Sequence, residues 1–98
     1  MTNAPIKNKI AKGKFVVGND RGLHTRPSTE IVKCASSFKS RVYLIYQKQF
    51  VNAKSLLGVL MLAASRGARI RIEAEGDDAE EAVQSILLLA MNNFHINY

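Results

Sequence analysis

The spacing of hydrophobic and polar positions changes several times along the chain, and each change marks a new predicted element. Strict alternation over 68–75 indicates a strand with one solvent-facing side, whereas apolar positions three or four residues apart over 79–90 indicate a helix. Runs rich in β-branched and aromatic residues indicate further strands. Together the patterns predict strands over 14–18, 41–46, 50–53 and 68–75, and helices over 25–38, 55–65 and from 77 or 78 to 92.

Residues at the predicted boundaries agree with these elements. Pro27 fits the first turn of a helix, where its missing N–H has no intrahelical partner in any case. Ser55 suits the N-cap of the second helix, and Gly67 suits its end. Asp77 or Asp78 suits the N-cap of the last helix. The order strand, helix, strand, strand, helix, strand, helix predicts an α+β fold, a two-layer open-faced sandwich with a four-stranded antiparallel sheet and three helices on one face.

The helical periodicity also predicts which side chains face the core. Cys34 lies beside the apolar stripe of the first helix, so we expect a structural role for this sole cysteine. One cysteine cannot form an intrachain disulfide, which fits a reducing, cytoplasmic setting. No Cys/His cluster has metal-ligand spacing, so we expect neither a metal nor a cofactor. The expected core positions are Ile31, Ala35 and Phe38 in the first helix and Ala79, Ala82, Val83, Ile86 and Ala90 in the last.

Length and charge distribution predict one domain with a basic extension. A chain of 98 residues can bury a core of its own. Its formal net charge is +6, but four of its 14 Lys and Arg residues fall within 1–14, where there is no acidic residue. We therefore expect a basic, solvated N-terminal tail over 1–13 and a single domain over 14–98.

The same composition disfavours two classes of partner. The sequence has neither a zinc finger nor a basic run interleaved with aromatic residues, so dedicated nucleic-acid binding is not expected. A weak electrostatic attraction of the tail to acidic partners or nucleic acid stays open as an alternative. Residues 1–14 lack the apolar core of a secretory signal, and the longest apolar run, 56–64, is too short to span a bilayer. Membrane insertion is therefore not expected either.

The segment Gly-Leu-His-Thr-Arg-Pro over 22–27 places an imidazole, a guanidinium and a helix start close together. With His24 at the N-cap, the N–H groups of Thr25 and Arg26 and the positive end of the helix dipole form an anion site. Arg26 adds a forked, charge-assisted contact to phosphate oxygens. An unprotonated imidazole is a nucleophile. The segment thus suits a phosphoryl group, although a histidine beside an arginine at a helix start is also a common surface cap.

A second segment, Asn-Ala-Lys-Ser-Leu-Leu-Gly over 52–58, combines an N-cap serine with apolar residues. Ser55 is an ordinary N-cap by its position, and a phosphate on the same hydroxyl would lie at the helix N-terminus beside apolar surface. Leu56, Leu57 and Leu60 are spaced so that some of them lie at the rim of the helix or outside it. We expect an exposed apolar patch suited to docking other proteins, with core packing of each leucine as the alternative.

Together the two segments resemble the HPr family, the histidine phosphocarriers of the bacterial phosphoenolpyruvate-dependent phosphotransferase system. The resemblance covers about residues 14–91, with 22–27 matching the phosphohistidine signature and 52–59 the regulatory-serine segment. The predicted order of elements is also that of the HPr fold. Thr25 and Ser28 stand where the family usually has alanine, and the basic tail makes the chain longer at its start than a typical member.

The resemblance implies a role for each residue of the first segment. His24 would accept a phosphoryl group from phospho-Enzyme I, on Nδ1 in the family, and pass it to a sugar-specific Enzyme IIA component. Arg26 and the N–H groups of Thr25 and Arg26 would hold the phosphate, while Pro27 would set the helix start. Such a protein is a phosphocarrier rather than an enzyme, and we expect a monomer.

The resemblance also implies regulation. An HPr kinase/phosphorylase would act on Ser55, and the added phosphate would hinder partner docking at the three leucines that follow. Two other functions stay open. One is a nitrogen-branch phosphocarrier, which 60–62 and the final helix also resemble. The other is a purely regulatory binding module controlled by phosphorylation of Ser55, in which His24 takes no part.

Overall fold

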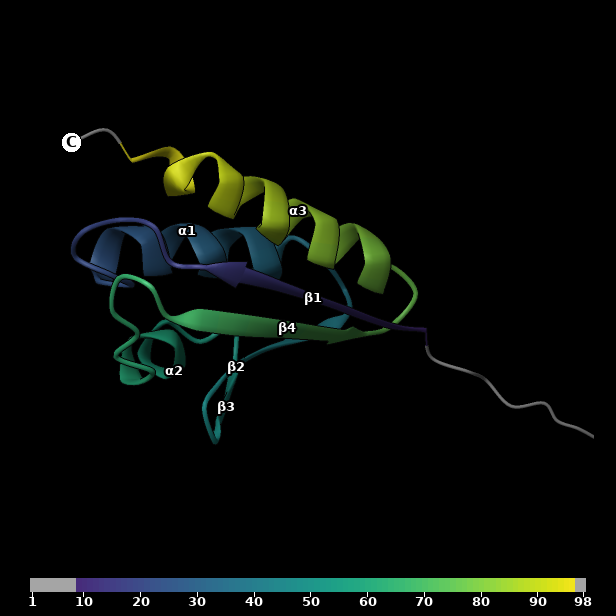
Figure 1. Ribbon diagram of the computed structural model, residues 1–98. Helices are drawn as coiled ribbons and strands as arrows, with labels where there is room; N and C mark the ends of the chain where they lie inside the picture. Colours follow the sequence, from purple (N-terminus) through teal and green to yellow (C-terminus); the bar gives the residue numbers. More distant parts are fainter. Residues whose placement is uncertain (1–8, 97–98) are drawn as a thin grey trace, which may run out of the picture.

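The computed structural model describes residues 9–96, which form one sheet and its covering helices (Figure 1). The strands are β1 (Ile10–Val16), β2 (Arg41–Tyr46), β3 (Gln49–Asn52) and β4 (Arg69–Glu75). The helices are α1 (Thr25–Ser36), α2 (Leu56–Met61) and α3 (Ala79–Met91), followed by the 3₁₀ helix η1 (Asn93–His95). This order confirms the predicted sequence of elements.

The four strands form an antiparallel sheet in the order β1-β4-β2-β3. Alternation along β4 turns Ile70 and Ile72 towards the helices, where both are fully buried, and leaves Arg69 and Arg71 exposed on the other side. The sheet therefore has one face in the core and one face that no helix covers within the described residues. The predicted two-layer α+β sandwich is confirmed.

The helices complete a single hydrophobic core. In Figure 1, α1 and α3 run side by side above β4, and α2 lies near the β2–β3 hairpin. Ile31 of α1, Val59 of α2 and Ile86 of α3 are all fully buried in one cluster. Each such side chain contributes about 1.5–3 kcal/mol by leaving water. Phe15 and Phe94 meet edge to face in the same core, with ring centroids 5.9 Å apart.

The first strand begins earlier than predicted. It starts at Ile10 rather than at residue 14, so residues 10–13, predicted as tail, pair with β4. Two features of this edge strand explain why the hydrophobic pattern did not predict residues 10–13 as part of it. Its alternate lysines point to solvent, as is common at sheet edges. Gly13 faces the core where α3 lies close to the strand, and an added Cβ would come within 2.8 Å of Val83, so this core position carries no apolar side chain. The predicted tail over 1–8 lies outside the described residues.

The second helix ends earlier than predicted. It stops at Met61 instead of residue 65, because Ala63 adopts a left-handed conformation with φ of 51°. The chain then turns back towards the loop before α1, where the carbonyl of Ala64 accepts a hydrogen bond from Leu23. The other predicted boundaries differ from the observed ones by at most two residues. No helix within 9–96 has the length and apolar content needed to cross a membrane.

Candidate functional site

His24 is the N-cap residue of α1, as predicted. Its backbone is extended, with φ of −78° and ψ of −166°, and its carbonyl accepts the first helical hydrogen bond from the N–H of Ser28 over 3.1 Å. The N–H groups of Thr25 and Arg26 come earlier in the helix than this first donor, so no helical carbonyl accepts from them, and Pro27 has no N–H. The half-buried imidazole does not cap the helix itself. Two helix N–H groups and the positive dipole end therefore lie beside the histidine.

Hydrogen bonds fix the loop that leads into this helix. Gly22 has φ of +69°, a conformation that glycine adopts without strain. Its carbonyl accepts from the side chain of Asn19 over 2.6 Å, and its N–H donates to the Asn19 carbonyl over 3.0 Å. The next residue, Leu23, donates its N–H to Ala64 over 2.8 Å and accepts from the buried hydroxyl of Ser28 over 3.0 Å. The backbone is thus held on both sides immediately before the histidine.

A shallow hollow of about 370 Å³ opens beside His24. Thr25 and Leu60 line it, so the predicted phosphate site and the predicted docking patch share one surface. Arg21 also lines the hollow and is exposed, and the sequence interpretation missed it. The sequence could have indicated it, because Arg21 directly precedes the loop glycine before α1 and so adds positive charge near the N-terminus of that helix. The full lining consists of Arg21, Leu23, His24, Thr25, Leu60, Ala63, Ala64 and Ser65.

Arg26 is exposed and lines a neighbouring hollow of about 180 Å³, between the start of α1 and the chain around η1. Thr25 lines both hollows. The guanidinium thus belongs to the surface next to the histidine hollow rather than to its lining. Pro27 is buried in the first turn of α1, where it needs no hydrogen-bond partner.

Ser55 is the N-cap residue of α2, as predicted, and its hydroxyl accepts a hydrogen bond from the N–H of Gly58 over 3.1 Å. The side chain is half-buried. Its position is that of an ordinary helix cap, which stabilises a helix by about 1 kcal/mol. Phosphorylation at this hydroxyl stays a prediction.

The apolar patch that follows Ser55 is exposed as predicted, with one addition. Leu57 is 69% exposed and Leu56 37%, whereas Leu60 is half-buried in the hollow beside the histidine. Met61, 65% exposed, belongs to the same surface and was not predicted. It follows Leu57 by four residues, so helical spacing alone could have identified it.

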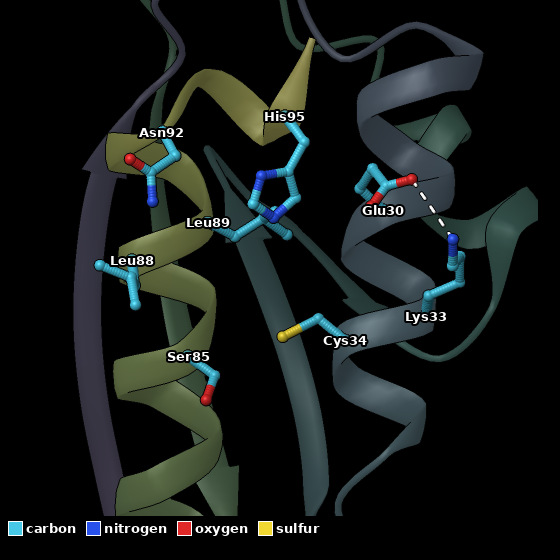
Figure 2. A pocket seen from close by; sticks show the side chains of 8 residues that line it. All are labelled: Glu30, Lys33, Cys34, Ser85, Leu88, Leu89, Asn92 and His95. Carbon is cyan, nitrogen blue, oxygen red and sulfur yellow. Dashed lines mark ion pairs between the residues drawn. The ribbon is translucent and has the colours of Figure 1, made fainter.

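A separate cleft of about 340 Å³ lies between α1 and α3 (Figure 2). Cys34 points into it from α1, towards Ser85 and Leu89 of α3, and burial raises the pKa of its thiol. Glu30 and Lys33 form an ion pair at its rim, 3.5 Å apart. None of the predicted site residues lines this cleft. Residues 9–96 contain no group of three His, Cys, Asp or Glu side chains that could hold a metal ion.

The fold and the site define a class of small proteins, open-faced α+β sandwiches that present a histidine at the N-terminus of the first helix. The family described as "PTS HPr component phosphorylation site" matches residues 11–92, which is most of the chain. The chain therefore belongs to the HPr family, the phosphocarriers of the phosphotransferase system.

Individual relatives agree with this assignment. The phosphocarrier protein HPr of Xylella fastidiosa (strain 9a5c) is 39% identical over 82 residues, which cover 84% of this chain and 92% of that protein. The crystal structure of HPr-C-His from Thermoanaerobacter tengcongensis has a TM-score of 0.85 at 34% identity, covering 90% of this chain and 99% of the other. An HPr dimer from the same organism has a TM-score of 0.70 at 35% identity, covering 96% and 98%.

Proposed function

We propose that this chain accepts a phosphoryl group on His24 from phospho-Enzyme I and passes it to an Enzyme IIA component. The observation that supports this most directly is the position of the histidine at the N-cap of α1, beside the N–H groups of Thr25 and Arg26. Membership in the HPr family supplies the reaction class and the general identity of the partners.

In each transfer, the bond between phosphorus and the donor group breaks as a bond between phosphorus and the acceptor nitrogen or oxygen forms. The phosphoryl oxygens carry negative charge, which the two N–H groups and the dipole of α1 stabilise. Arg21 lines the hollow at His24 and Arg26 lines the neighbouring hollow, and both exposed side chains add to this positive field. A surface hollow is sufficient, because the partner protein supplies the other half of the reaction site.

We assign partner docking to the exposed patch on α2. Leu56, Leu57 and Met61 offer apolar surface, and Leu60 connects that surface to the hollow at His24. A phosphate on Ser55 adds about −1.5 to −2 charges at the edge of this patch and three strongly hydrated oxygens. An HPr kinase/phosphorylase acting there would weaken the docking of partners that bury this patch away from water.

Phosphoryl transfer from phosphoenolpyruvate through Enzyme I tests the histidine assignment. The wild-type chain should acquire an acid-labile label, and His24→Ala should acquire none. Equal labelling of the two proteins would reject His24 as the acceptor. Transfer of the label from the purified phosphoprotein to Enzyme IIA proteins of the sugar and nitrogen branches identifies the acceptor. If the chain instead takes only an acid-stable label from ATP and HPr kinase, a purely regulatory module is favoured.

Serine labelling needs its own control. HPr kinase with ATP should give an acid-stable phosphate on the wild type and none on Ser55→Ala, and a label that persists in this variant would reject the assignment. We further propose that the protein acts as a cytoplasmic monomer. A related HPr has been solved as a dimer, so the mass in solution should be measured by light scattering.

A further inference from the structure

The open face of the sheet brings together side chains from all four strands. Lys14 of β1 pairs with Arg71 of β4, Arg71 pairs with Ile45 of β2, and Ile45 pairs with Phe50 of β3. Directly paired residues of neighbouring strands point to the same face. This row therefore crosses all four strands, about 14 Å at the usual strand spacing. We call Lys14, Arg69, Arg71, Tyr43 and Phe50 the basic-aromatic face.

Burial shows that this surface lies opposite the core. Ile45 is buried but is not a member of the core cluster, and its register with Arg71 and Phe50 places it on the open face. The rings of Tyr43 and Phe50 lie 4.8 Å apart, tilted by 31°. Phe50 is nevertheless 57% exposed. An aromatic pair therefore presents accessible ring surface on a face that the described helices leave uncovered.

The charge on this face is positive in the row that contains Phe50. Lys14, Arg69 and Arg71 are all exposed. Glu73 lies one row further along β4, directly opposite Tyr43 of β2, and on its other side it forms an ion pair with Lys12 over 4.0 Å. The row that contains Phe50 has two cations, Lys14 and Arg71, and no acidic residue, and the acidic charge of the Tyr43 row is paired with Lys12. The chemistry of this face fits a polyanion that also offers flat apolar rings.

We propose that the basic-aromatic face binds single-stranded nucleic acid. Unstacked bases lie against the accessible ring surface of Tyr43 and Phe50, and the backbone phosphates contact the cations of β1 and β4. Base–aromatic stacking tolerates any sequence, because every base has a flat face. A duplex offers no free base to the rings. The sequence does not reveal the surface, because only the strand order assembles it.

Fluorescence anisotropy with labelled single strands of about 12 nucleotides, oligouridine and oligothymidine, tests this binding at about 50 and 200 mM salt. The double variant Arg69→Gln/Arg71→Gln should weaken binding at least tenfold and reduce the slope of log K against log salt by about 1.4, since each lost phosphate contact removes about 0.7. The matched control Lys33→Gln/Lys39→Gln removes two exposed cations elsewhere and should leave the slope unchanged.

A second variant separates stacking from charge. Phe50→Leu keeps an apolar side chain opposite Ile45 but removes the ring, and should weaken single-strand binding by about fivefold or more with an unchanged salt slope. Thermal unfolding checks that both variants are folded. The inference is overturned if no binding occurs at low salt, if the lysine control weakens binding as much, or if Phe50→Leu binds normally. Stronger binding to a duplex or to anionic vesicles would overturn it as well, as would binding lost entirely in Lys7→Gln/Lys9→Gln.

Discussion

The backbone N–H of Leu23 donates a hydrogen bond to the carbonyl of Ala64 over 2.8 Å, and this bond joins the loop before His24 to the segment after α2. The segment can reach the loop because α2 ends at Met61. A longer helix would direct the chain away from the site. The early end of α2 is therefore part of how the fold positions the histidine.

Gly22→Ala should distort this junction. The residue has φ of +69°, and an added Cβ would overlap the carbonyl oxygen of Ala64. We expect a loss of about 2 kcal/mol in the free energy of unfolding, measured in urea, from backbone strain and displacement of the segment. Phosphoryl transfer from Enzyme I should also slow, because the displaced loop carries His24.

Gly67→Ala is the matched control for that substitution. Gly67 has φ of +89°, but an added Cβ would have no heavy atom within 4 Å. The variant should lose about 1 kcal/mol from the left-handed conformation alone and transfer phosphate at the wild-type rate. If both variants transfer phosphate equally well, the Leu23–Ala64 junction does not position the histidine.

Arg26→Ala and Arg21→Ala should each slow phosphoryl transfer, by roughly tenfold for the former, because each removes a cation near the proposed phosphate site. Both side chains are exposed, so stability in urea should not change. Arg66→Ala is the control, since that guanidinium is also exposed but pairs with Asp20 over 2.8 Å and lines neither hollow. Rates unchanged in both site variants would remove the electrostatic role assigned to them.

Ser55→Asp should raise the KM of Enzyme I for this chain without changing kcat, because the added charge lies beside the proposed docking patch and not at His24. Aspartate is itself a good N-cap, so α2 should persist. Ser55→Asn, a neutral residue that also caps helices, should show the wild-type KM. An equal rise in KM in both variants would mean that the altered cap, rather than the charge, impairs docking.

The sequence predicted features with local signals and missed features that depend on distant contacts. The N-cap positions of His24 and Ser55 follow from short-range helix-start patterns and are confirmed. The left-handed Ala63 has no such signature, because its conformation serves the contact between Ala64 and the loop before α1. The pairing of Lys14 with Arg71 required the strand order, which the linear pattern leaves undetermined.

Asp78 shows a similar long-range effect at the N-terminus of α3. It is the one of the two predicted residues that occupies the N-cap position, but its carboxylate does not cap that helix. Instead it accepts hydrogen bonds from the hydroxyl and N–H of Ser40 and from the N–H of Lys39, with both N–H contacts at 2.9 Å. The Ser40 hydroxyl first, and then the Lys39 N–H, lower the pKa of Asp78 from its ordinary 3.8 to about 2.

Acid should therefore weaken the fold through this residue. Because the pKa of Asp78 is lower in the folded than in the unfolded state, its contribution is complete above pH 3.8 and disappears as the pH falls towards 2. We expect the urea midpoint of the wild type to decrease over that range. Asp78→Asn should be less stable near neutral pH and show a smaller decrease, whereas Asp77→Asn, an exposed neighbour, should retain the wild-type profile. Parallel profiles for the wild type and Asp78→Asn would show that protonation of other carboxylates causes the acid sensitivity.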